Sequence, residues 1–167
     1  MKTNPSHIIL NAEQIQQKTK RMAYQILEDH LNEDELILVG VQKSGYAFAE
    51  AIATQLESIA QFKISLGNIS INKKNPIEAI QTSLKTEDYQ GKAVVIIDDV
   101  LNSGATLIYA VKHFLEVPLK QLKTAVLVDR SHKRFPVKAD YKGLSLSTSL
   151  QETVQVEFGK KARVVLK

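Results

Sequence analysis

Short, continuous runs of apolar residues recur along the chain and predict strands that are buried on both faces. These runs occupy residues 36–41, 93–97 and 125–128, and a looser alternation at 62–71 predicts a further strand. Near the C-terminus, short apolar runs at 154–158 and 164–166 flank a predicted turn at 159–162. The last two strands should therefore form a small terminal hairpin.

Apolar residues at helical spacing fill the intervals between several of these runs. After a short polar segment, the first predicted helix is capped by Asn11 with Gln14 and ends near Leu31. A second helix is predicted at 46–59, and a third begins at about Thr106 and ends at Pro118. Alternating strands and helices predict an α/β fold with a mostly parallel, twisted sheet and helices on both faces.

Two stretches show neither the helical nor the strand spacing of apolar residues. Residues 72–90 are polar and predict a long mobile excursion, which in compact domains is usually functional or disordered. Residues 130–142 are basic and predict an irregular segment. The 167 residues suit one domain without a separate second unit.

The amino-acid composition excludes some classes of function but does not indicate a particular one. Cysteine is absent, which excludes disulfides, thiolate metal sites and a cysteine nucleophile. No apolar run reaches the length of about 18 residues that a membrane span requires, so we expect a cytoplasmic protein without a membrane partner. The net charge of +4 permits an anionic partner without requiring one.

The strongest candidate site is the string from Val94 to Thr106, in which Asp98 and Asp99 end a buried strand. Adjacent carboxylates repel each other, so hydroxyls or a cation normally compensate for them. The small residues that follow open a helix, whose free N–H groups and Gly104 suit a phosphate. The chemistry suggests a phosphorylated polyol. The alternative is a solvated strand end before a capped helix. The string is neither a Gly-Lys-Ser/Thr phosphate loop nor a Gly-x-Gly-x-x-Gly motif.

A second candidate follows the first buried strand, where Gly40 precedes Gln42, Lys43, Ser44 and Gly45 at the start of a helix. Backbone amides and one lysine can accept the charge of a pyrophosphate. The alternative is an ordinary turn that Ser44 caps.

The string at 94–106 resembles the phosphoribosyl diphosphate (PRPP) signature of type I phosphoribosyltransferases. The resemblance implies that Asp98 and Asp99 hold the ribose hydroxyls directly or through PRPP-bound Mg²⁺. It assigns the 5-phosphate to Asn102, Ser103, Gly104, Ala105 and Thr106, and the pyrophosphate to Gln42, Lys43, Ser44 and Gly45. Asn102 stands where purine-salvage members carry an Asp that manages a proton of the base, which argues against a 6-oxopurine substrate.

The segment from Ala125 to Tyr141 is similar to the base-binding hood of the pyrimidine-operon attenuation proteins, which are bifunctional uracil phosphoribosyltransferases that bind mRNA. The similarity implies one domain over 1–167, with a hood over about 129–167 and, as an open alternative, the N-terminal segment. It assigns the base to Val128, Asp129, Arg130 and His132, and RNA phosphates to Lys20, Arg21, Lys133, Arg134 and Lys138. A solvated basic surface is the alternative for the RNA residues.

Taken together, the resemblance implies a phosphoribosyltransferase that converts PRPP and a nucleobase, expected to be uracil, to a nucleoside 5′-monophosphate and pyrophosphate with Mg²⁺. An mRNA leader is a further expected partner, and a dimer or higher homo-oligomer is expected. Departures at Lys43, Ser44, Asn102 and Ala105 leave two alternatives open. One is a nucleotide-sensing RNA-binding regulator without catalysis, and the other is a salvage enzyme for a different base without RNA binding.

Overall fold

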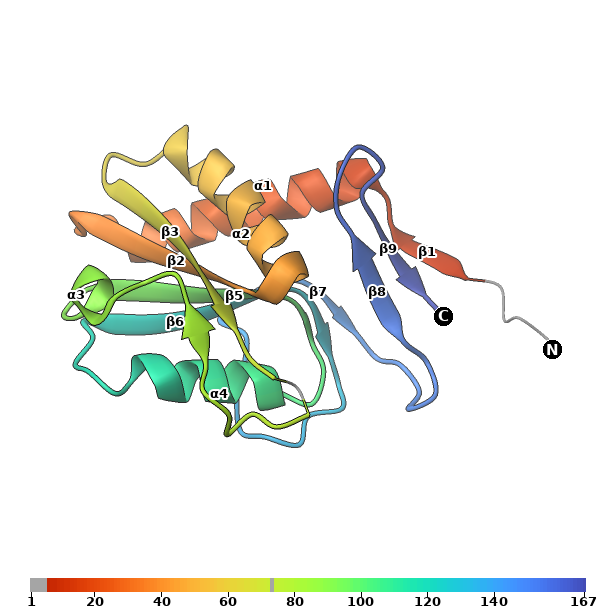
Figure 1. Cartoon of the computed structure of the whole chain (residues 1–167). Coiled ribbons are helices and arrows are strands. Elements are labelled where there is room, and N and C mark those ends of the chain that lie inside the picture. Colours follow the sequence, from red (N-terminus) through yellow and green to blue (C-terminus); the bar gives the residue numbers. More distant parts are fainter. Residues whose placement is uncertain (1–5, 73) are drawn as a thin grey trace.

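Two sheets build the fold, and helices cover both faces of the larger one (Figure 1). The computed structural model describes residues 6–72 and 74–167. The larger sheet has the strand order β4-β3-β2-β5-β6-β7, and the smaller has the order β1-β9-β8. All neighbours in the larger sheet are parallel except β3 and β4, whereas the smaller sheet is antiparallel.

In chain order, the larger sheet takes β2 (Glu35–Val41), β3 (Lys63–Ser70), β4 (Gln81–Thr82), β5 (Ala93–Leu101), β6 (Gln121–Arg130) and β7 (Tyr141–Leu146). The smaller sheet takes β1 (His7–Leu10), β8 (Val154–Glu157) and β9 (Arg163–Leu166). The helices are α1 (Ala12–Asp29), α2 (Gln42–Glu57), α3 (Thr86–Tyr89) and α4 (Ala105–Phe114).

Side chains of the central strands alternate between two cores. Leu38, Val95 and Leu127 face the cluster under α1 and α2, whereas Val39, Ile96 and Val126 face the cluster under α4. This alternation follows from the period of two in a strand, and it explains why β2, β5 and β6 read as continuous apolar runs. The predicted α/β fold with a mostly parallel sheet and a terminal hairpin is confirmed.

Helix α1 has the predicted cap. Asn11 accepts a hydrogen bond from the Gln14 N–H, and the Gln14 side chain accepts one from the Asn11 N–H, both at 2.9 Å. Further along the helix, Arg21 donates to the carbonyls of Lys142 and Gly143, at 3.1 and 2.9 Å. These bonds fasten α1 to the edge strand β7.

A half-buried ion cluster ties together the amino-terminal ends of three strands. Glu35 lies 2.7 Å from the Lys92 ammonium and 3.6 Å from that of Lys63, and it accepts a hydrogen bond from Ser65 at 2.7 Å. The hydrogen bond from Lys92, followed by that from Ser65, holds the pKa of Glu35 below its ordinary value. The cluster therefore favours the charged carboxylate in the folded protein.

The structure corrects several boundaries. The helix predicted at 46–59 is α2 at 42–57, so residues 42–45 form its first turn, and Val41 is its N-cap without a side-chain cap from Ser44.

Helix α4 ends at Phe114, before Pro118, because a turn already follows its last residue. The predicted strand at 93–97 runs on to Leu101, so the two acids lie within β5. The polar segment before Asn11 contains strand β1, which completes the smaller sheet by pairing with β9.

The two stretches without a period also contain regular structure. The excursion at 72–90 includes the short strand β4, which pairs with β3, and the single helical turn α3. The basic segment at 130–142 begins with the end of β6 and ends with the start of β7, so only its middle is irregular. Local sequence missed these elements because they are short and their pairing partners are distant in the chain.

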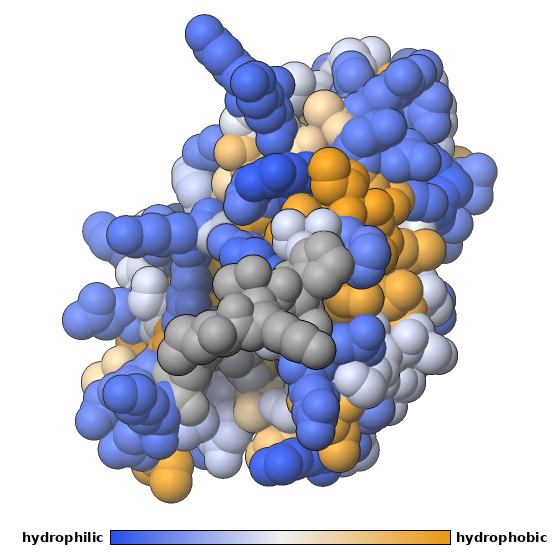
Figure 2. Space-filling view, turned by 90° about the vertical axis from the view of Figure 1, so that its right-hand side faces the viewer, coloured by the Kyte–Doolittle hydropathy of each residue, from blue (hydrophilic) through white to orange (hydrophobic). Residues whose placement is uncertain are grey.

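The smaller sheet lies beyond the carboxyl ends of the parallel strands (Figure 1). Viewed onto this end of the molecule, the surface is mostly hydrophilic, with a hydrophobic area to one side (Figure 2). Among the described residues, no helix combines the length and the hydropathy that a membrane crossing requires.

Candidate functional site

The candidate site lies at the carboxyl ends of β2 and β5, the end of the sheet that faces the smaller sheet (Figure 1). Strand β2 passes directly into α2, whose first turn is residues 42–45, and a short loop joins β5 to α4. Both helix N-termini therefore lie at the same edge. Open α/β sheets bind ligands at this edge, because the loops and helix N-termini converge there.

The acid pair is held by its own strand. Asp98 Oδ1 accepts a hydrogen bond from the Asp99 N–H, and Asp99 Oδ1 accepts one from the Val100 N–H, both at 2.8 Å. Both side chains are half-buried. The carboxylates are thus fixed where the strand meets the site, and they supply acidic oxygens for hydroxyls or a cation.

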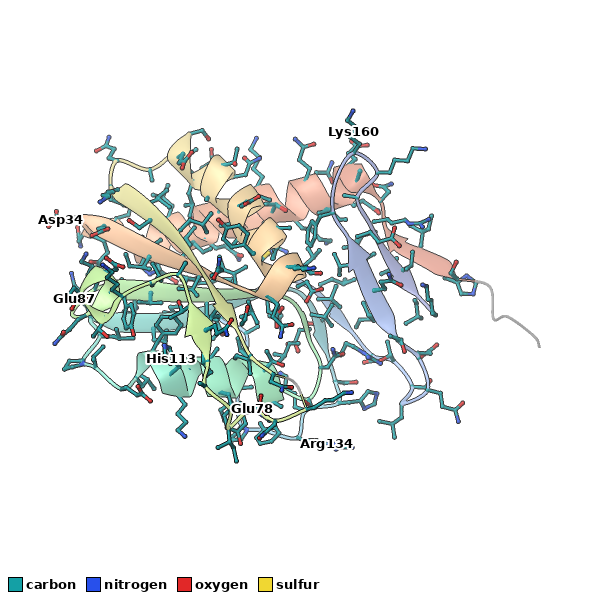
Figure 3. The ribbon with its side chains drawn as sticks, viewed as in Figure 1. Asp34, Glu78, Glu87, His113, Arg134 and Lys160 are labelled. Atoms are coloured by element: carbon teal, nitrogen blue, oxygen red, sulfur yellow. The ribbon has the colours of Figure 1, made fainter. Side chains whose placement is uncertain are left out.

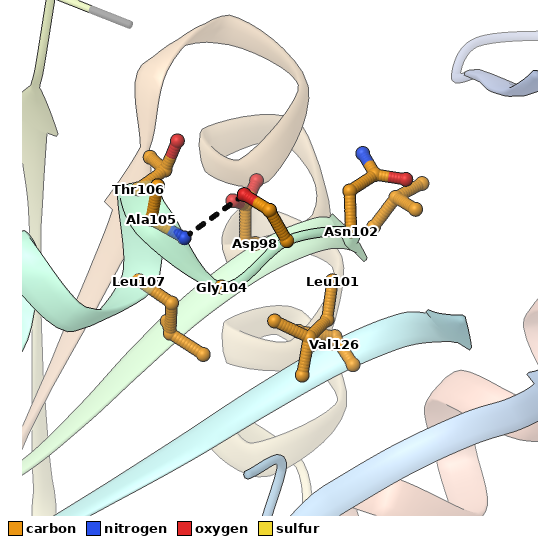
Figure 4. Close-up of a pocket in the computed structure, with 10 residues that line it drawn as sticks. Asp98, Leu101, Asn102, Gly104, Ala105, Thr106, Leu107 and Val126 are labelled. Carbon is orange, nitrogen blue, oxygen red and sulfur yellow. Dashed lines mark hydrogen bonds between the residues drawn. The ribbon is translucent and has the colours of Figure 1, made fainter. Parts of the chain in front are cut away.

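The loop after β5 forms a shallow hollow lined by Asp98 and by residues 100–107 with Val126 (Figure 4). Gly104 has a φ of +88°, and a Cβ at this position would lie 2.6 Å from a methyl carbon of Val137. Only glycine fits this conformation and this contact without strain. The Ser103 hydroxyl accepts a hydrogen bond from the Ala105 N–H at 3.2 Å, so the predicted phosphate residues do form one concave surface.

The first turn of α2 faces the acid pair across a cleft of about 570 Å³, which is lined by residues 41–46, Asn68, Ser70, Asp98 and Asp99. A Cβ on Gly45 would lie 2.9 Å from the Ile97 carbonyl oxygen and 3.0 Å from Asp98 Oδ1. Gln42 has a φ of +53° and donates from its amide to the Ile71 carbonyl. Glycine at 45 therefore lets the first turn of α2 approach the acids closely, while Lys43 is exposed.

The predicted base-binding residues form a connected hydrogen-bond network. The Arg130 guanidinium donates to Thr148 Oγ1 at 2.8 and 3.0 Å, to the Glu152 carbonyl at 2.6 Å and to Asn102 Oδ1 at 2.9 Å. His132 Nε2 contacts the Thr148 carbonyl. The network joins the carboxyl end of β6 to the segment between β7 and β8 and to the phosphate loop.

Asp129, at 9% exposure, is the most deeply buried charged residue of the predicted base-binding set. Lys133 Nζ lies 3.3 Å from its Oδ1, although the geometry gives that oxygen no hydrogen bond, and Lys142 Nζ lies 3.8 Å from its Oδ2. The buried side chain of Val128 belongs to the core under α1 and α2. Val128 can therefore contribute to a ligand only through its backbone.

The predicted RNA residues come from two segments of the chain, helix α1 and the segment between β6 and β7. Arg21 and its neighbour Lys20 lie on α1, where Arg21 contacts β7. Arg134 lies beside the phosphate loop, where its N–H donates to the Ser103 carbonyl at 2.8 Å. Lys133 is paired with Asp129, and Lys138 lies 3.7 Å from Asp140. Lys142 connects the two groups, because Arg21 donates to its carbonyl and its ammonium lies 3.8 Å from Asp129, the partner of Lys133.

Sequence reasoning missed four residues of the site and its network: Asn68, Ser70, Thr148 and Glu152. Asn68 and Ser70 end β3, which neighbours β2, so the parallel pairing brings them to the cleft. Their polar side chains at the end of a predicted strand were the sequence feature that could have placed them at the site. Glu152 acts through its backbone carbonyl, which no side-chain pattern could indicate.

Mg²⁺ prefers oxygen ligands, and proteins commonly supply one or two carboxylates while substrate phosphates and water supply the rest. Asp98 and Asp99 fit such a role, since both line the cleft. Across residues 6–72 and 74–167 there is no group of three or more His, Cys, Asp or Glu side chains that could hold a metal. The donor set therefore fits a metal that arrives with a phosphorylated substrate.

Comparison with known proteins gives consistent matches. The sequence pattern of the phosphoribosyl transferase domain matches residues 6–158. The bifunctional protein PyrR of Haemophilus ducreyi is 34% identical over 160 residues, which cover 89% of this chain and 88% of the relative. The bifunctional protein PyrR of Streptomyces coelicolor is 33% identical over 157 residues, which cover 89% and 81%.

Solved structures give the same fold. A hypoxanthine-guanine phosphoribosyltransferase of Bacillus anthracis matches with a TM-score of 0.71 and 25% identity, over 83% of this chain and 81% of that chain. The hypoxanthine phosphoribosyltransferase of Trypanosoma cruzi matches with a TM-score of 0.76 and 20% identity, over 95% and 94%. The second likeness concerns the fold alone.

Proposed function

The chain belongs to the phosphoribosyl transferase domain family and is a phosphoribosyltransferase, and from this premise we propose that it transfers the phosphoribosyl group of PRPP to uracil. The products are uridine 5′-monophosphate (UMP) and pyrophosphate. The similarity to proteins named bifunctional further supports a second role in RNA binding that responds to pyrimidine nucleotides.

One observation carries the enzymatic proposal. Asp98 lines both the hollow of the β5–α4 loop and the cleft beside the first turn of α2. PRPP has a 5-phosphate at one end, a pyrophosphate at the other and two hydroxyls between them. Two helix N-termini with an acid pair between them match this order of charges. The roles of the individual residues follow from this match.

In this assignment, the loop at residues 103–106 binds the 5-phosphate through the Ser103 hydroxyl and backbone N–H groups other than that of Ala105, which donates to Ser103, and Asp98 and Asp99 bind the ribose hydroxyls. Residues 42–45 bind the pyrophosphate, with Lys43 as the positive charge. Mg²⁺ bound with PRPP would neutralise part of the leaving-group charge, and Asp98 and Asp99 would hold it directly or through the substrate. The chain's own contribution is to position the reactants and to stabilise charge.

The base would approach from the side of β5 opposite the proposed pyrophosphate site. That site, in the first turn of α2, follows β2 on one side of β5, and β6 lies on the other side. The nucleobase therefore lies over the end of β6, beside Arg130 and the segment 147–153. His132 and Glu152 lie there but already contact the Thr148 carbonyl and the Ser149 N–H, so backbone groups of this region would orient the ring.

The regulatory proposal rests on the relatives and on charge. RNA phosphates would contact Lys20, Arg21, Lys133, Arg134 and Lys138, and such contacts make affinity fall with salt. The chain spans most of the length of its PyrR relatives, so RNA would bind to the surface of the catalytic domain. A cytoplasmic location and an oligomer remain predictions.

The test is pyrophosphate release from PRPP and Mg²⁺ with a panel of nucleobases, repeated with Asp99→Asn. Turnover with uracil that needs Mg²⁺ and falls in the variant supports the proposal. Turnover only with another base would rule out uracil as the substrate, whereas the assignment as a phosphoribosyltransferase would stand. No turnover with any base, together with nucleotide-dependent binding to a pyrimidine leader RNA, would favour the non-catalytic regulator.

A further inference from the structure

Gln42, the first residue of α2, has an unusual backbone conformation. Its φ is +53°, and it is the one non-glycine residue with a positive φ in the part of the chain that the structure describes. The left-handed region costs free energy for a residue that has a Cβ, whereas glycine enters it freely. A contact elsewhere in the fold must therefore hold Gln42 in this conformation.

The side chain of Gln42 makes such a contact. Its Nε2 atom donates a hydrogen bond to the backbone carbonyl of Ile71. A carbonyl only accepts hydrogen bonds, so the NH₂ group of the amide must face Ile71. Ile71 is 2% exposed and belongs to the core under α4, which fixes the acceptor in place. The hydrogen bond therefore ties the start of α2 to the chain that leaves β3.

The conformation at Gln42 shapes the anion site proposed for the first turn of α2. A left-handed residue next to right-handed ones directs successive N–H groups to one side and forms a concave anion site. Residues 42–45 line the cleft together with Asp98 and Asp99. The N-cap is Val41, whose side chain cannot accept a hydrogen bond and so leaves these N–H groups to a ligand. Loss of the left-handed conformation would redirect the N–H groups.

We propose that Gln42 is a positioning residue, whose side chain holds its own backbone in the conformation that the pyrophosphate site requires. The inference rests on the proposed function, because it takes pyrophosphate to be the anion at this turn. In this role the side chain of Gln42 bonds to Ile71 and does not contact the ligand. The backbone N–H groups of residues 43–45 contact the pyrophosphate.

Two substitutions separate the side chain from the backbone. Gln42→Met keeps the length of the side chain but removes the donor, so a residue with a Cβ must become left-handed without the hydrogen bond. Gln42→Gly also removes the bond, but glycine adopts this conformation without steric cost. Gln55→Met and Gln55→Gly are the matched controls, since Gln55 lies near the other end of α2. Calorimetry with pyrophosphate and Mg²⁺ gives each dissociation constant, and thermal melts check that each variant is folded.

We expect Gln42→Met to bind pyrophosphate about tenfold more weakly than the wild type, because only a minor fraction of the protein then has the binding conformation. Gln42→Gly should bind within about threefold of the wild type, and both Gln55 variants should match the wild type. Glycine has no side chain that could contact a ligand. Its recovery of affinity is therefore the result that neither a direct contact of the glutamine nor general destabilisation would give.

Three results overturn the inference. They are no affinity of the wild type for pyrophosphate, equal affinity in the wild type and Gln42→Met, and a loss in Gln42→Gly as large as that in Gln42→Met. If Gln42→Met does not fold, the glycine variant still decides, since a large loss of affinity there contradicts the inference and near-wild-type affinity supports it. Failure of the proposed function looks different, because it is the absence of turnover with every base while these affinities still differ.

Discussion

At the scale of single residues, the acid pair carries the largest share of the functional assignment. We expect Asp99→Asn to lower kcat/KM for PRPP about 100-fold, since it weakens hydrogen bonds between a charged acceptor and the ribose hydroxyls. Steady-state kinetics with saturating base measure the effect. The matched control is Asp34→Asn, because Asp34 is exposed and lies at the other end of the sheet (Figure 3). Equal losses in both variants would contradict the assignment.

Gly104 tests the geometry of the phosphate loop. Gly104→Ala places a Cβ at a φ of +88° and 2.6 Å from the Val137 methyl carbon. We expect a loss of about 2 kcal/mol in the free energy of unfolding, from backbone strain and overpacking together, and a raised KM for PRPP. Urea denaturation measures the first effect. Gly91→Ala is a useful comparison, because Gly91 also has a positive φ but a Cβ there would meet nothing within 4 Å. A stability loss no greater than in Gly91→Ala would show that the Val137 contact costs nothing.

The sequence singled out Asp98, Asp99 and Gly104 because strand end, charge and helix start coincide in one short string. The structure places these residues at the hollow and the cleft, and their roles in binding stay predictions. The hydrogen bond between Asn102 and Arg130 was not foreseen, since it joins residues 28 positions apart. No local pattern encodes which atom of an amide faces a distant guanidinium.

At the scale of elements, the ion cluster around Glu35 joins β2, β3 and the start of β5. Its partners hold the folded-state pKa of Glu35 below the ordinary value of 4.5. The carboxylate therefore contributes stability above its unfolded pKa, and this contribution is lost as the pH falls through the lower folded-state pKa. We expect Glu35→Gln to lower the free energy of unfolding by about 1 kcal/mol at pH 7.

Urea titrations of wild type and Glu35→Gln at several pH values check the sign. The difference between them should persist down to about pH 5 and shrink at more acid pH. A difference that grows on acidification would contradict the assigned role of the charged carboxylate.

Arg21 and Lys20 are neighbouring basic residues of α1, and the contact of Arg21 with β7 gives them different expected effects on stability. Arg21→Met removes the bonds to the Lys142 and Gly143 carbonyls, so we expect a stability loss of about 1 kcal/mol. Lys20→Met should change stability by less than about 0.5 kcal/mol. Both variants should weaken leader-RNA binding and reduce its salt dependence. Unchanged RNA affinity in Lys20→Met at low salt would argue against α1 as part of an RNA surface.

Most elements were predictable because their patterns are strong. The capping pair Asn11 and Gln14 marked the start of α1, and continuous apolar runs marked β2, β5 and β6. The strands β1, β4 and β7 were missed, since each gains its stability from a partner strand elsewhere in the fold. Tertiary pairing overrides weak local signals of this kind.

At the scale of the whole molecule, the topology determines the order of the proposed subsites. The strand order β2-β5-β6 places the first turn of α2, the acid pair and Arg130 side by side along one edge. The smaller sheet lies beyond that edge (Figure 1). This order is the one that we propose for the pyrophosphate, the ribose and the base.

The identity and stoichiometry of the products test the central claim most directly. The protein is incubated with PRPP, uracil and Mg²⁺, and chromatography with mass spectrometry quantifies UMP and pyrophosphate. We predict equal amounts of the two products, formed only when Mg²⁺ and uracil are present, and a loss of both with Asp99→Asn. Intact PRPP and no nucleotide with uracil or any other base would contradict the account.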